Sequence, residues 1–359
     1  MHTQALPRIA RALAALAAAW LLLACSHTMH TSSNLQRDTS YGAVVGAADA
    51  ASGTLSWKGV PYAAPPVGPL RWRAPAEPQP WAAPRPATAF APACVQTGRL
   101  YGPGLNNRHD ETIGRTLGQT LGAEDCLYLN IWQPAAPADP PRPVIVWVHG
   151  GSNITGYTAD PVYDGANLAR TADAVVVSVN YRLGIFGFLD IPALKPGQPT
   201  EDSGNFALLD LVKALSFVRQ NIARFGGDPA RVTLMGESAG AVNVYALLTS
   251  PMLAGQPPLF HRVIALSGGL STSVWAARGQ ALLTHALVAD GTAADAGAAR
   301  AYLATRSPQQ VAAYLRGLSA DALLTTVRTR LTPLGMAASN PIPDGTVVAT
   351  DPIAAVRAG

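Results

Sequence analysis

The residues best suited to chemistry are the five at positions 236–240, which read Gly-Glu-Ser-Ala-Gly. A short apolar run precedes them and a run of helix formers follows. Between a strand and a helix, such a motif forms a nucleophile elbow, a turn so sharp that side chains at Gly236 or Gly240 would clash. We therefore predict that Ser238 is a catalytic nucleophile, with Gly236, Glu237 and Gly240 completing the elbow. The alternative is a glycine-rich turn with a bystander serine.

A second candidate element, His-Gly-Gly-Ser-Asn at 149–153, directly follows another apolar run. It resembles the HGGG-type loop that supplies backbone N–H groups to an oxyanion hole. We expect Gly151 and Ser152 to donate there, together with the N–H of Ala239. Each such donor is typically worth about 2.7–4 kcal/mol of barrier. Ser152 stands where glycine is commonest, but only its backbone is needed. His149 is expected to be a structural residue at the strand end rather than a base.

Alternating apolar runs and helical patterns indicate the elements that position these residues. Four apolar runs lie at 144–148, 174–179, 232–235 and 263–266. None shows clear polar alternation, which is typical of strands buried on both faces of a parallel sheet. Helical patterns separate them: apolar residues recur at helical spacing over 206–222, and 239–248 is a compact run of good helix formers. Ser307 before Pro308 predicts a further helix start. The pattern predicts the α/β class, with a mostly parallel central sheet and flanking helices.

Five motifs, in their order and spacing, resemble the type-B carboxylesterase family, which also contains the cholinesterases. They are GVPYA at 59–63, EDCLYLN at 124–130, NYRLG at 180–184, FGGDP at 225–229 and GESAG at 236–240. The resemblance implies an α/β-hydrolase fold and ester hydrolysis through an acyl-enzyme on Ser238. It also implies a small-molecule ester substrate and no metal or organic cofactor. Glu237 would lie near the site but outside the triad, and Arg182 and Asp210 would form a buried structural ion pair.

The N-terminus predicts export. Two arginines precede an apolar stretch at 12–24, which is too short to span a bilayer and fits a signal-peptide core. It ends Leu-Leu-Ala-Cys, which resembles a bacterial lipoprotein cleavage box, so we expect residues 1–24 to be removed and Cys25 to be lipidated. Residues 25–40 would then tether the domain at 41–359 to a membrane of the bacterial envelope. The alternative is an ordinary secretory signal.

Cysteine usage fits an exported protein. The chain has three cysteines, so lipidation of Cys25 would leave Cys94 and Cys126. An even remainder in such a protein predicts a disulfide, and the family resemblance implies the same pairing. Closing this loop would stabilise the fold by roughly 3.5–4 kcal/mol on the chain-entropy model. The alternative is two unpaired buried thiols.

Composition narrows the choice of partners. The 26 basic residues stand against 22 acidic ones, and they form no clustered stripe of the kind that nucleic acid requires. Cholinesterases carry a tryptophan in the disulfide loop that stacks on choline by a cation–π interaction. In this chain Tyr101 is the only aromatic residue between Cys94 and Cys126. A choline ester is therefore disfavoured, and neutral carboxylic esters are the expected substrates.

The residues after Ser238 do not provide a complete triad. In this fold the order is serine, acid, histidine, but the two later histidines, His261 and His285, precede every later acid. Those acids are Asp290, Asp295, Asp321, Asp344 and Asp351. We expect that the sequence is cut off at Gly359, that the acid and histidine lie beyond it, and that residues 1–359 alone have little turnover. The alternatives are a non-catalytic cholinesterase-like binding protein and a truncated pseudoenzyme.

Overall fold

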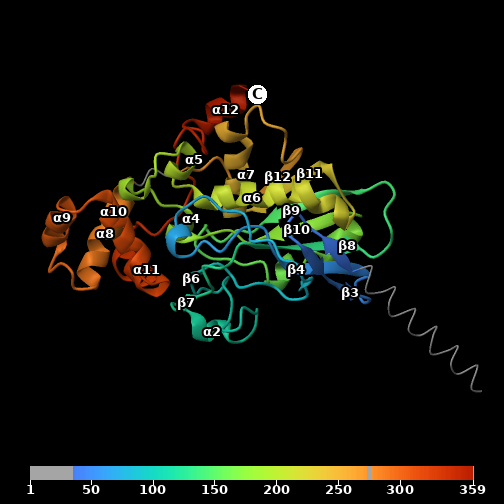
Figure 1. The fold of residues 1–359 in the computed structure, drawn as a ribbon, viewed down its shortest axis with the longest axis horizontal. Coiled ribbons are helices and arrows are strands. Elements are labelled where there is room, and N and C mark those ends of the chain that lie inside the picture. Colours follow the sequence, from blue (N-terminus) through green and yellow to red (C-terminus); the bar gives the residue numbers. More distant parts are fainter. Residues whose placement is uncertain (1–34, 273–275, 359) are drawn as a thin grey trace, which may run out of the picture.

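A seven-stranded sheet forms the centre of the fold (Figure 1). The computed structural model describes residues 35–272 and 276–358. The strand order across the sheet is β12-β11-β9-β10-β8-β4-β3. The strands are β3 (Ala47–Asp49), β4 (Thr54–Pro61), β8 (Tyr128–Pro134), β9 (Arg142–Val148), β10 (Val175–Val179), β11 (Gly227–Glu237) and β12 (Arg262–Leu266).

The sheet divides into a parallel half and an antiparallel half. β12, β11, β9 and β10 pair in parallel, and these are the four strands that the apolar runs predicted. β10 pairs with β8, β8 with β4 and β4 with β3 in the antiparallel sense. The prediction of a mostly parallel sheet therefore holds only for the first group, and the sheet is mixed. The sequence analysis did not predict β4 and β8, because polar residues interrupt the apolar residues of both strands.

The chain joins the folded domain earlier than expected. Two smaller sheets contain β1 (Gln36–Asp38), β2 (Ala43–Val45) and β5 (Arg85–Pro86), and β6 (Gln96–Thr97) with β7 (Thr120–Leu121). β1 pairs with β2, and the Trp57 indole N–H donates to the carbonyl of Leu35 at 2.7 Å. Residues 35–40 of the tether expected at 25–40 therefore belong to the folded domain, and residues 25–34 lie outside the described ranges.

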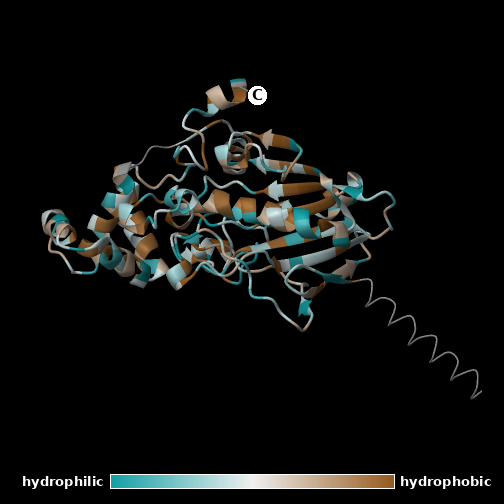
Figure 2. Cartoon of the chain, turned by 45° about the horizontal axis from the view of Figure 1, so that its top comes forward, coloured by the Kyte–Doolittle hydropathy of each residue, from teal (hydrophilic) through white to brown (hydrophobic). Residues whose placement is uncertain are grey.

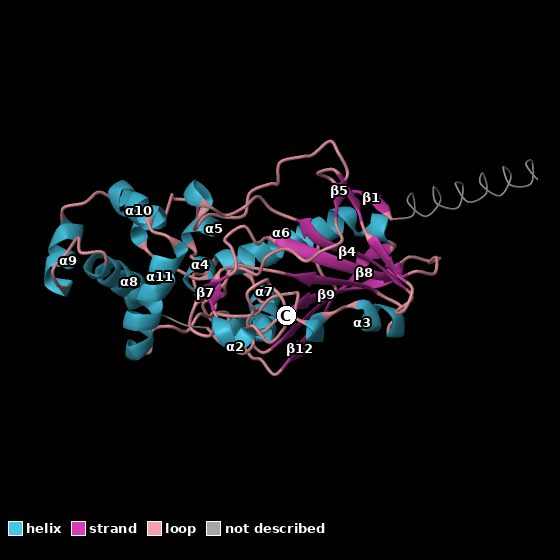
Figure 3. Ribbon diagram, turned by 90° about the horizontal axis from the view of Figure 1, so that it is seen from below, coloured by secondary structure: helices cyan, strands magenta, loops and turns pink. Residues whose placement is uncertain are grey.

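Helices cover both faces of the sheet (Figure 3). Side chains alternate along a strand, so Trp132 and Val176 face one side, where they pack against α3 (Ala166–Thr171). The opposite face belongs to the main core, which includes α6 (Phe206–Asn221). α7 (Ala239–Leu248) follows β11 directly and contacts β11 and β12. The helical patterns of the sequence predicted both α6 and α7.

Four further helices gather beyond the end of the sheet, on the left in Figure 1. They are α8 (Ala276–Ala289), α9 (Ala296–Ala304), α10 (Pro308–Gly317) and α11 (Ala320–Thr326), and the π-helix η6 (Val327–Leu331) follows. At the start of α10, the Ser307 hydroxyl accepts from the Gln310 N–H, and the Gln310 side chain accepts from the Ser307 N–H. The predicted N-cap is confirmed.

Short helical turns connect these elements. The α-helical ones are α2 (Ile113–Thr116), α4 (Gly184–Gly187), α5 (Pro199–Asp202) and α12 (Pro352–Ala358). The 3-10 turns are η1 (Gly68–Leu70), η2 (Pro161–Tyr163), η3 (Pro192–Leu194), η4 (Ile222–Phe225), η5 (Pro251–Leu253) and η7 (Thr332–Leu334). Several begin at a proline, whose fixed φ suits the first helical position.

Apolar residues concentrate in the sheet strands and in the helices beside them (Figure 2). Trp57, Trp72 and Trp132 are among the largest fully buried side chains. Within the described ranges, no helix combines the length and the apolar character that crossing a bilayer requires. The expected signal segment 1–24 and Cys25 lie outside those ranges.

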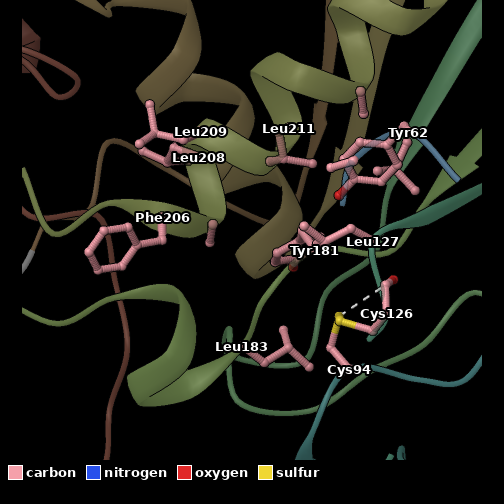
Figure 4. Packing of buried hydrophobic residues seen from close by; sticks show 14 of the residues in the cluster. Tyr62, Cys94, Cys126, Leu127, Tyr181, Leu183, Phe206, Leu208, Leu209 and Leu211 are labelled. Atoms are coloured by element: carbon pink, nitrogen blue, oxygen red, sulfur yellow. Dashed lines mark hydrogen bonds between the residues drawn. A yellow bond between two sulfur atoms is a disulfide. The ribbon is translucent and has the colours of Figure 1, made fainter. Parts of the chain in front are cut away.

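A disulfide joins Cys94 to Cys126, which confirms the predicted pairing. Both cysteines are buried in the main core, and Figure 4 shows the bridge beside Leu183. The bridge closes a segment that contains α2 and both strands of the β6–β7 pair. The disulfide therefore holds this long, mostly irregular segment next to the start of β8.

Replacing both cysteines by alanine is expected to lower the free energy of unfolding. The bridge spans a sequence separation of 32, for which the chain-entropy model gives about 3–4 kcal/mol. Urea denaturation of the Cys94→Ala/Cys126→Ala variant measures the loss. Wild-type protein reduced while unfolded is the control and should match the variant. A loss of less than about 1 kcal/mol relative to the oxidised wild-type protein would contradict the entropic account.

A buried ion pair fixes the segment that follows β10. The Arg182 guanidinium donates to both carboxylate oxygens of Asp210, at 2.8 and 2.7 Å, and the Arg182 N–H donates to the same carboxylate. The two side chains are 4% and 0% exposed. The pairing implied by the family resemblance is therefore present. It joins α6 to the loop in which Gly184 N–H donates to the carbonyl of Asn153.

Asp210→Ala is expected to destabilise the fold by about 3–5 kcal/mol, because it leaves the buried Arg182 charge without a partner. The matched control is Asp228→Ala, which removes the partly exposed pair with Arg231 and should cost about 1 kcal/mol or less. Thermal and urea unfolding measure both losses. Equal effects of the two substitutions would show that the burial of the first pair does not matter.

Candidate active site

Ser238 occupies a strained turn between β11 and α7. Its backbone has φ 52° and ψ −120°, a left-handed conformation that costs a residue with a side chain on the order of 1–3 kcal/mol. The Ser238 N–H donates to the carbonyl of Leu266, at the end of β12, at 2.8 Å. The side chain is half-buried, and its hydroxyl makes no hydrogen bond within the described part of the chain. The predicted nucleophile is thus held by its backbone.

The two elbow glycines stand where a side chain has no space. A Cβ on Gly236 would lie 2.5 Å from the carbonyl carbon of Gly240. A Cβ on Gly240 would lie 2.2 Å from the carbonyl oxygen of Val148, at the end of β9. Both distances are far below van der Waals contact, so these positions require glycine for the reason that the motif suggested. Gly268, which the sequence did not single out, packs equally closely against the Ser238 carbonyl.

The loop after β9 lies against the nucleophile. A Cβ on Gly150 would stand 3.1 Å from Ser238 Cβ and 2.6 Å from Glu237 Oε2, so this glycine borders the elbow directly. The N–H groups of Gly151 and Ser152 donate to no acceptor within the described ranges. Ala239 is the first residue of α7, where backbone N–H groups lack intrahelical acceptors. The three predicted oxyanion donors therefore keep their N–H groups available beside the elbow.

Buried polar side chains hold that loop in place. Ser152 and Asn153 have φ of 55° and 56°, a conformation that needs support in residues with side chains. The Asn153 amide exchanges hydrogen bonds with the amide of Asn243 on α7, at 3.2 and 2.8 Å. The Tyr181 hydroxyl donates to the carbonyl of His149 at 2.7 Å. Sequence reasoning missed Asn243 and Tyr181, because only the fold brings them to the loop.

Gln96 supports the far end of the same loop. Its side-chain oxygen accepts from the Thr155 hydroxyl at 2.7 Å and from the Gly156 N–H at 2.9 Å. Its side-chain nitrogen donates to the carbonyl of Gly156 at 2.9 Å. Gln96 lies two residues after Cys94, so the disulfide-bridged segment buttresses the oxyanion loop. No motif in the sequence indicated this residue.

His149 is structural, as expected. It is 1% exposed, its ring stacks on Tyr181 with centroids 4.6 Å apart, and its Nδ1 lies 2.8 Å from the carbonyl oxygen of Gly150. Burial lowers the pKa of this imidazole to about 4, so the ring is neutral at pH 7. A buried neutral ring that contacts its own loop rather than Ser238 is a packing element.

The other described histidines also serve elsewhere. His261 Nδ1 accepts from the Val232 N–H at 3.2 Å, which ties β12 to β11. His285 lies within α8, and His109 approaches Asp160. Within residues 35–272 and 276–358, no histidine contacts the Ser238 hydroxyl. The described residues therefore include the predicted nucleophile and the predicted oxyanion donors, but no histidine bonded to Ser238.

Glu237 brings a carboxylate to the elbow, where its Oε2 borders Gly150. Asp344, one of the five acids that follow Ser238 in the sequence, accepts from the N–H groups of residues 346–348. It also accepts from the side-chain amide of Asn205 at 3.1 Å. Its role is to shape a turn. In the described parts of the chain, His, Cys, Asp and Glu form no group of three or more that could hold a metal ion.

The comparisons with known proteins agree with this geometry. The model of the carboxylesterase family matches residues 33–359. The chain is 45% identical over 237 residues to the fumonisin B1 esterase of Sphingopyxis macrogoltabida, and 41% identical over 234 residues to the para-nitrobenzyl esterase of Bacillus subtilis. These alignments cover 66% and 65% of this chain, but 40% and 44% of the two relatives. The chain thus spans less than half the length of either relative.

Solved structures share the fold. A carboxylesterase of Geobacillus stearothermophilus superposes with a TM-score of 0.71 at 33% identity, covering 90% of this chain and 59% of that one. A PNB esterase gives a TM-score of 0.73 at 32% identity, covering 91% and 60%. The likeness therefore extends over nearly all of this chain. With the family model matched from residue 33 to residue 359, the chain belongs to the carboxylesterase family.

Proposed function

We propose that this protein hydrolyses carboxylic esters through an acyl-enzyme on Ser238. One observation carries the proposal. Ser238 sits in a strained turn at the start of α7, directly against a loop whose Gly151 and Ser152 N–H groups have no acceptor among the described residues. A nucleophile beside unoccupied backbone donors is the arrangement that acyl transfer requires.

Each group has a distinct part in the proposed reaction. The Ser238 hydroxyl attacks the ester carbonyl, and negative charge develops on the carbonyl oxygen. The N–H groups of Gly151, Ser152 and Ala239 donate to that oxygen, and the N-terminus of α7 adds positive potential. A histidine takes the Ser238 proton and gives it to the alcohol oxygen as the C–O bond of the ester breaks, so the alcohol leaves and the acyl group stays on Ser238. Water, deprotonated by the same histidine, then attacks the acyl carbonyl, and the bond to Ser238 Oγ breaks to release the carboxylic acid. On this proposal the histidine and its acid partner lie outside residues 35–272 and 276–358, since no described histidine contacts Ser238.

The relatives support small-molecule esters as the substrate class. Two of them are named for hydrolysis of fumonisin B1 and of para-nitrobenzyl esters, and a third, from rat, is named a pyrethroid hydrolase. The substrates in those names differ widely while the reaction type is shared. We therefore extend the reaction type, and no individual substrate, to this chain.

We also propose that the protein is exported and attached to a membrane through a lipid on Cys25. The support is the sequence alone: two arginines, a short apolar core and the Leu-Leu-Ala-Cys box. Acyl chains add about 0.8 kcal/mol of membrane affinity per buried CH₂. The folded domain begins by Leu35, which leaves about ten residues as a tether.

Ser238→Ala is expected to abolish ester hydrolysis by the protein isolated from its native host. Loss of the nucleophile typically lowers kcat by about 10⁶. Hydrolysis of p-nitrophenyl butyrate gives the rate. Intact mass after treatment with a fluorophosphonate shows whether a single adduct forms, and peptide mapping shows whether it is on Ser238. The matched control is Ser152→Ala, which keeps the backbone donor and should retain activity within a few-fold.

Turnover that survives in the Ser238→Ala variant would place the nucleophile elsewhere. Absence of both turnover and adduct in the native protein would favour the non-catalytic, cholinesterase-like binding protein instead. An adduct without turnover would show an activated serine that lacks the rest of the triad.

Gly150→Ala is expected to lower kcat by about 10²–10³, comparable to loss of one oxyanion donor. The new methyl group would stand 2.9 Å from the Glu237 carbonyl oxygen and 3.1 Å from Ser238 Cβ, so the loop must move away from the elbow. KM should change little. Steady-state kinetics on p-nitrophenyl butyrate measure both constants. The control is Gly269→Ala, whose Cβ meets nothing within 4 Å. Full activity of Gly150→Ala would contradict the tight packing of loop and elbow.

A further inference from the structure

One buried arginine lacks the partner that the others have. Four arginines are buried within the described ranges, each less than 8% exposed: Arg71, Arg142, Arg182 and Arg278. The first three each form an ion pair, with Glu124, Asp173 and Asp210 respectively. Arg278, at the start of α8, pairs with no carboxylate in this part of the chain. A buried charge without a counter-ion is costly, so its retention calls for a cause.

Arg278 lines a small cavity with two more arginines. The cavity has a volume of about 110 Å³, and Arg99 and Arg328 also line it. No Asp or Glu occurs among its described lining residues. The residues outside the described ranges, 1–34, 273–275 and 359, include no Asp or Glu either. Three arginines therefore line one cavity, with Arg278 buried, Arg328 half-buried and Arg99 exposed, and no Asp or Glu lines it with them.

The guanidinium groups are only partly satisfied. Arg278 donates to the Ala338 carbonyl at 2.8 Å and to the Ser339 hydroxyl at 2.9 Å, and Arg328 donates to the Thr325 hydroxyl at 2.9 Å. All three acceptors are neutral. Arg278 Nε and Arg328 Nη1 are buried and have no hydrogen-bond partner. Burial lowers the pKa of Arg278 to about 10, so it stays charged at neutral pH.

None of the described carboxylates of a neighbouring cavity forms an ion pair with Arg278. Arg278 also borders a larger cavity of about 400 Å³, where Asp190, Asp202 and Asp344 occur. Asp190 pairs with Lys195 at 2.8 Å, Asp202 accepts from the Gly197 N–H, and Asp344 accepts from backbone N–H groups. A purely structural role, holding residues 338–339, would account for Arg278. It would not account for Arg328, which lines the smaller cavity and whose buried Nη1 has no hydrogen-bond partner.

The arginine-lined cavity adjoins the oxyanion loop. Ile154 lines it, and the Ile154 N–H donates to the carbonyl of Gly151 at 3.0 Å. Gly184 also lines it, and its N–H donates to the carbonyl of Asn153. The wall of the cavity is therefore continuous with the loop that would bind the reacting carbonyl.

We propose that the cavity lined by Arg99, Arg278 and Arg328 binds a free carboxylate carried by the substrate. Guanidinium groups match carboxylate oxygens in geometry and charge, and a shielded site strengthens the interaction. The volume suits a carboxylate with a few carbons. The inference rests on the proposed esterase function and makes it more specific: the preferred substrate is an ester that also bears a carboxylate, such as a monoester of a dicarboxylic acid.

Direct binding tests the cavity without requiring turnover. Calorimetric titration with glutarate should give saturable binding, and glutaramide, its neutral diamide, should bind at least tenfold more weakly. Arg328→Gln should weaken glutarate binding at least tenfold. Arg330→Gln is the matched control, because Arg330 lies exposed on the same π-helix and outside the cavity lining, and it should change binding less than twofold. Arg328 is the test position because Arg278 also holds residues 338–339.

Three results would overturn the carboxylate site: equal binding of glutarate and glutaramide, no saturable binding of glutarate, or equal losses in the two variants. Turnover adds a second readout. Arg328→Gln should lower kcat/KM for mono-p-nitrophenyl glutarate about tenfold and leave p-nitrophenyl butyrate unchanged. Fluorophosphonate labelling of Ser238 separates the two proposals. Labelling without glutarate binding rejects only the carboxylate site, and glutarate binding without labelling or turnover rejects only the esterase function.

Discussion

The left-handed turn at Ser238 exists because glycines let neighbouring backbones approach it more closely than side chains allow. Gly240 brings the start of α7 against the last carbonyl of β9, and Gly268 brings the segment after β12 against the Ser238 carbonyl. Such a conformation persists only where its surroundings leave no relaxed alternative. The strands β9, β11 and β12 are consecutive neighbours in the sheet. The position of the nucleophile is therefore a property of three parallel strands together.

The expected oxyanion loop is held by side-chain hydrogen bonds, whereas Ser238 is held by close packing of backbones. Its Gly151 and Ser152 N–H groups make no hydrogen bond within the described residues, so they cannot anchor the loop themselves. Buried side chains of Asn243, Tyr181 and Gln96 hold it instead, and these come from α7, from the loop after β10 and from the disulfide-bridged segment. Donors that are fixed in advance and left unoccupied stabilise developing charge without reorganisation.

The buried and half-buried arginines fall into two groups: those that pair with a carboxylate of the fold and those that do not. Arg182 with Asp210, and Arg71 with Glu124, join distant segments and are neutralised within the fold. Arg278 and Arg328 come from the helical group beyond the sheet and remain without a carboxylate in the described part of the chain. The three parallel strands β9, β11 and β12 thus surround Ser238, while the helical group contributes the arginines that have no carboxylate partner.

The sequence by itself determined the elbow, the glycine-rich loop, the four parallel strands, α6, α7 and the pairing of Cys94 with Cys126, because each depends on local spacing or on a motif. The family followed from the same motifs. Only the tertiary structure decided the antiparallel half of the sheet, since β4 and β8 mix polar with apolar residues. Only it showed that residues 36–38 join the domain, that Gln96 and Asn243 support the oxyanion loop, and that Arg278 lines one cavity with Arg99 and Arg328. Those contacts join residues that are far apart in the chain. Tertiary packing decides which side chains meet across such a distance, and no local sequence pattern indicates it.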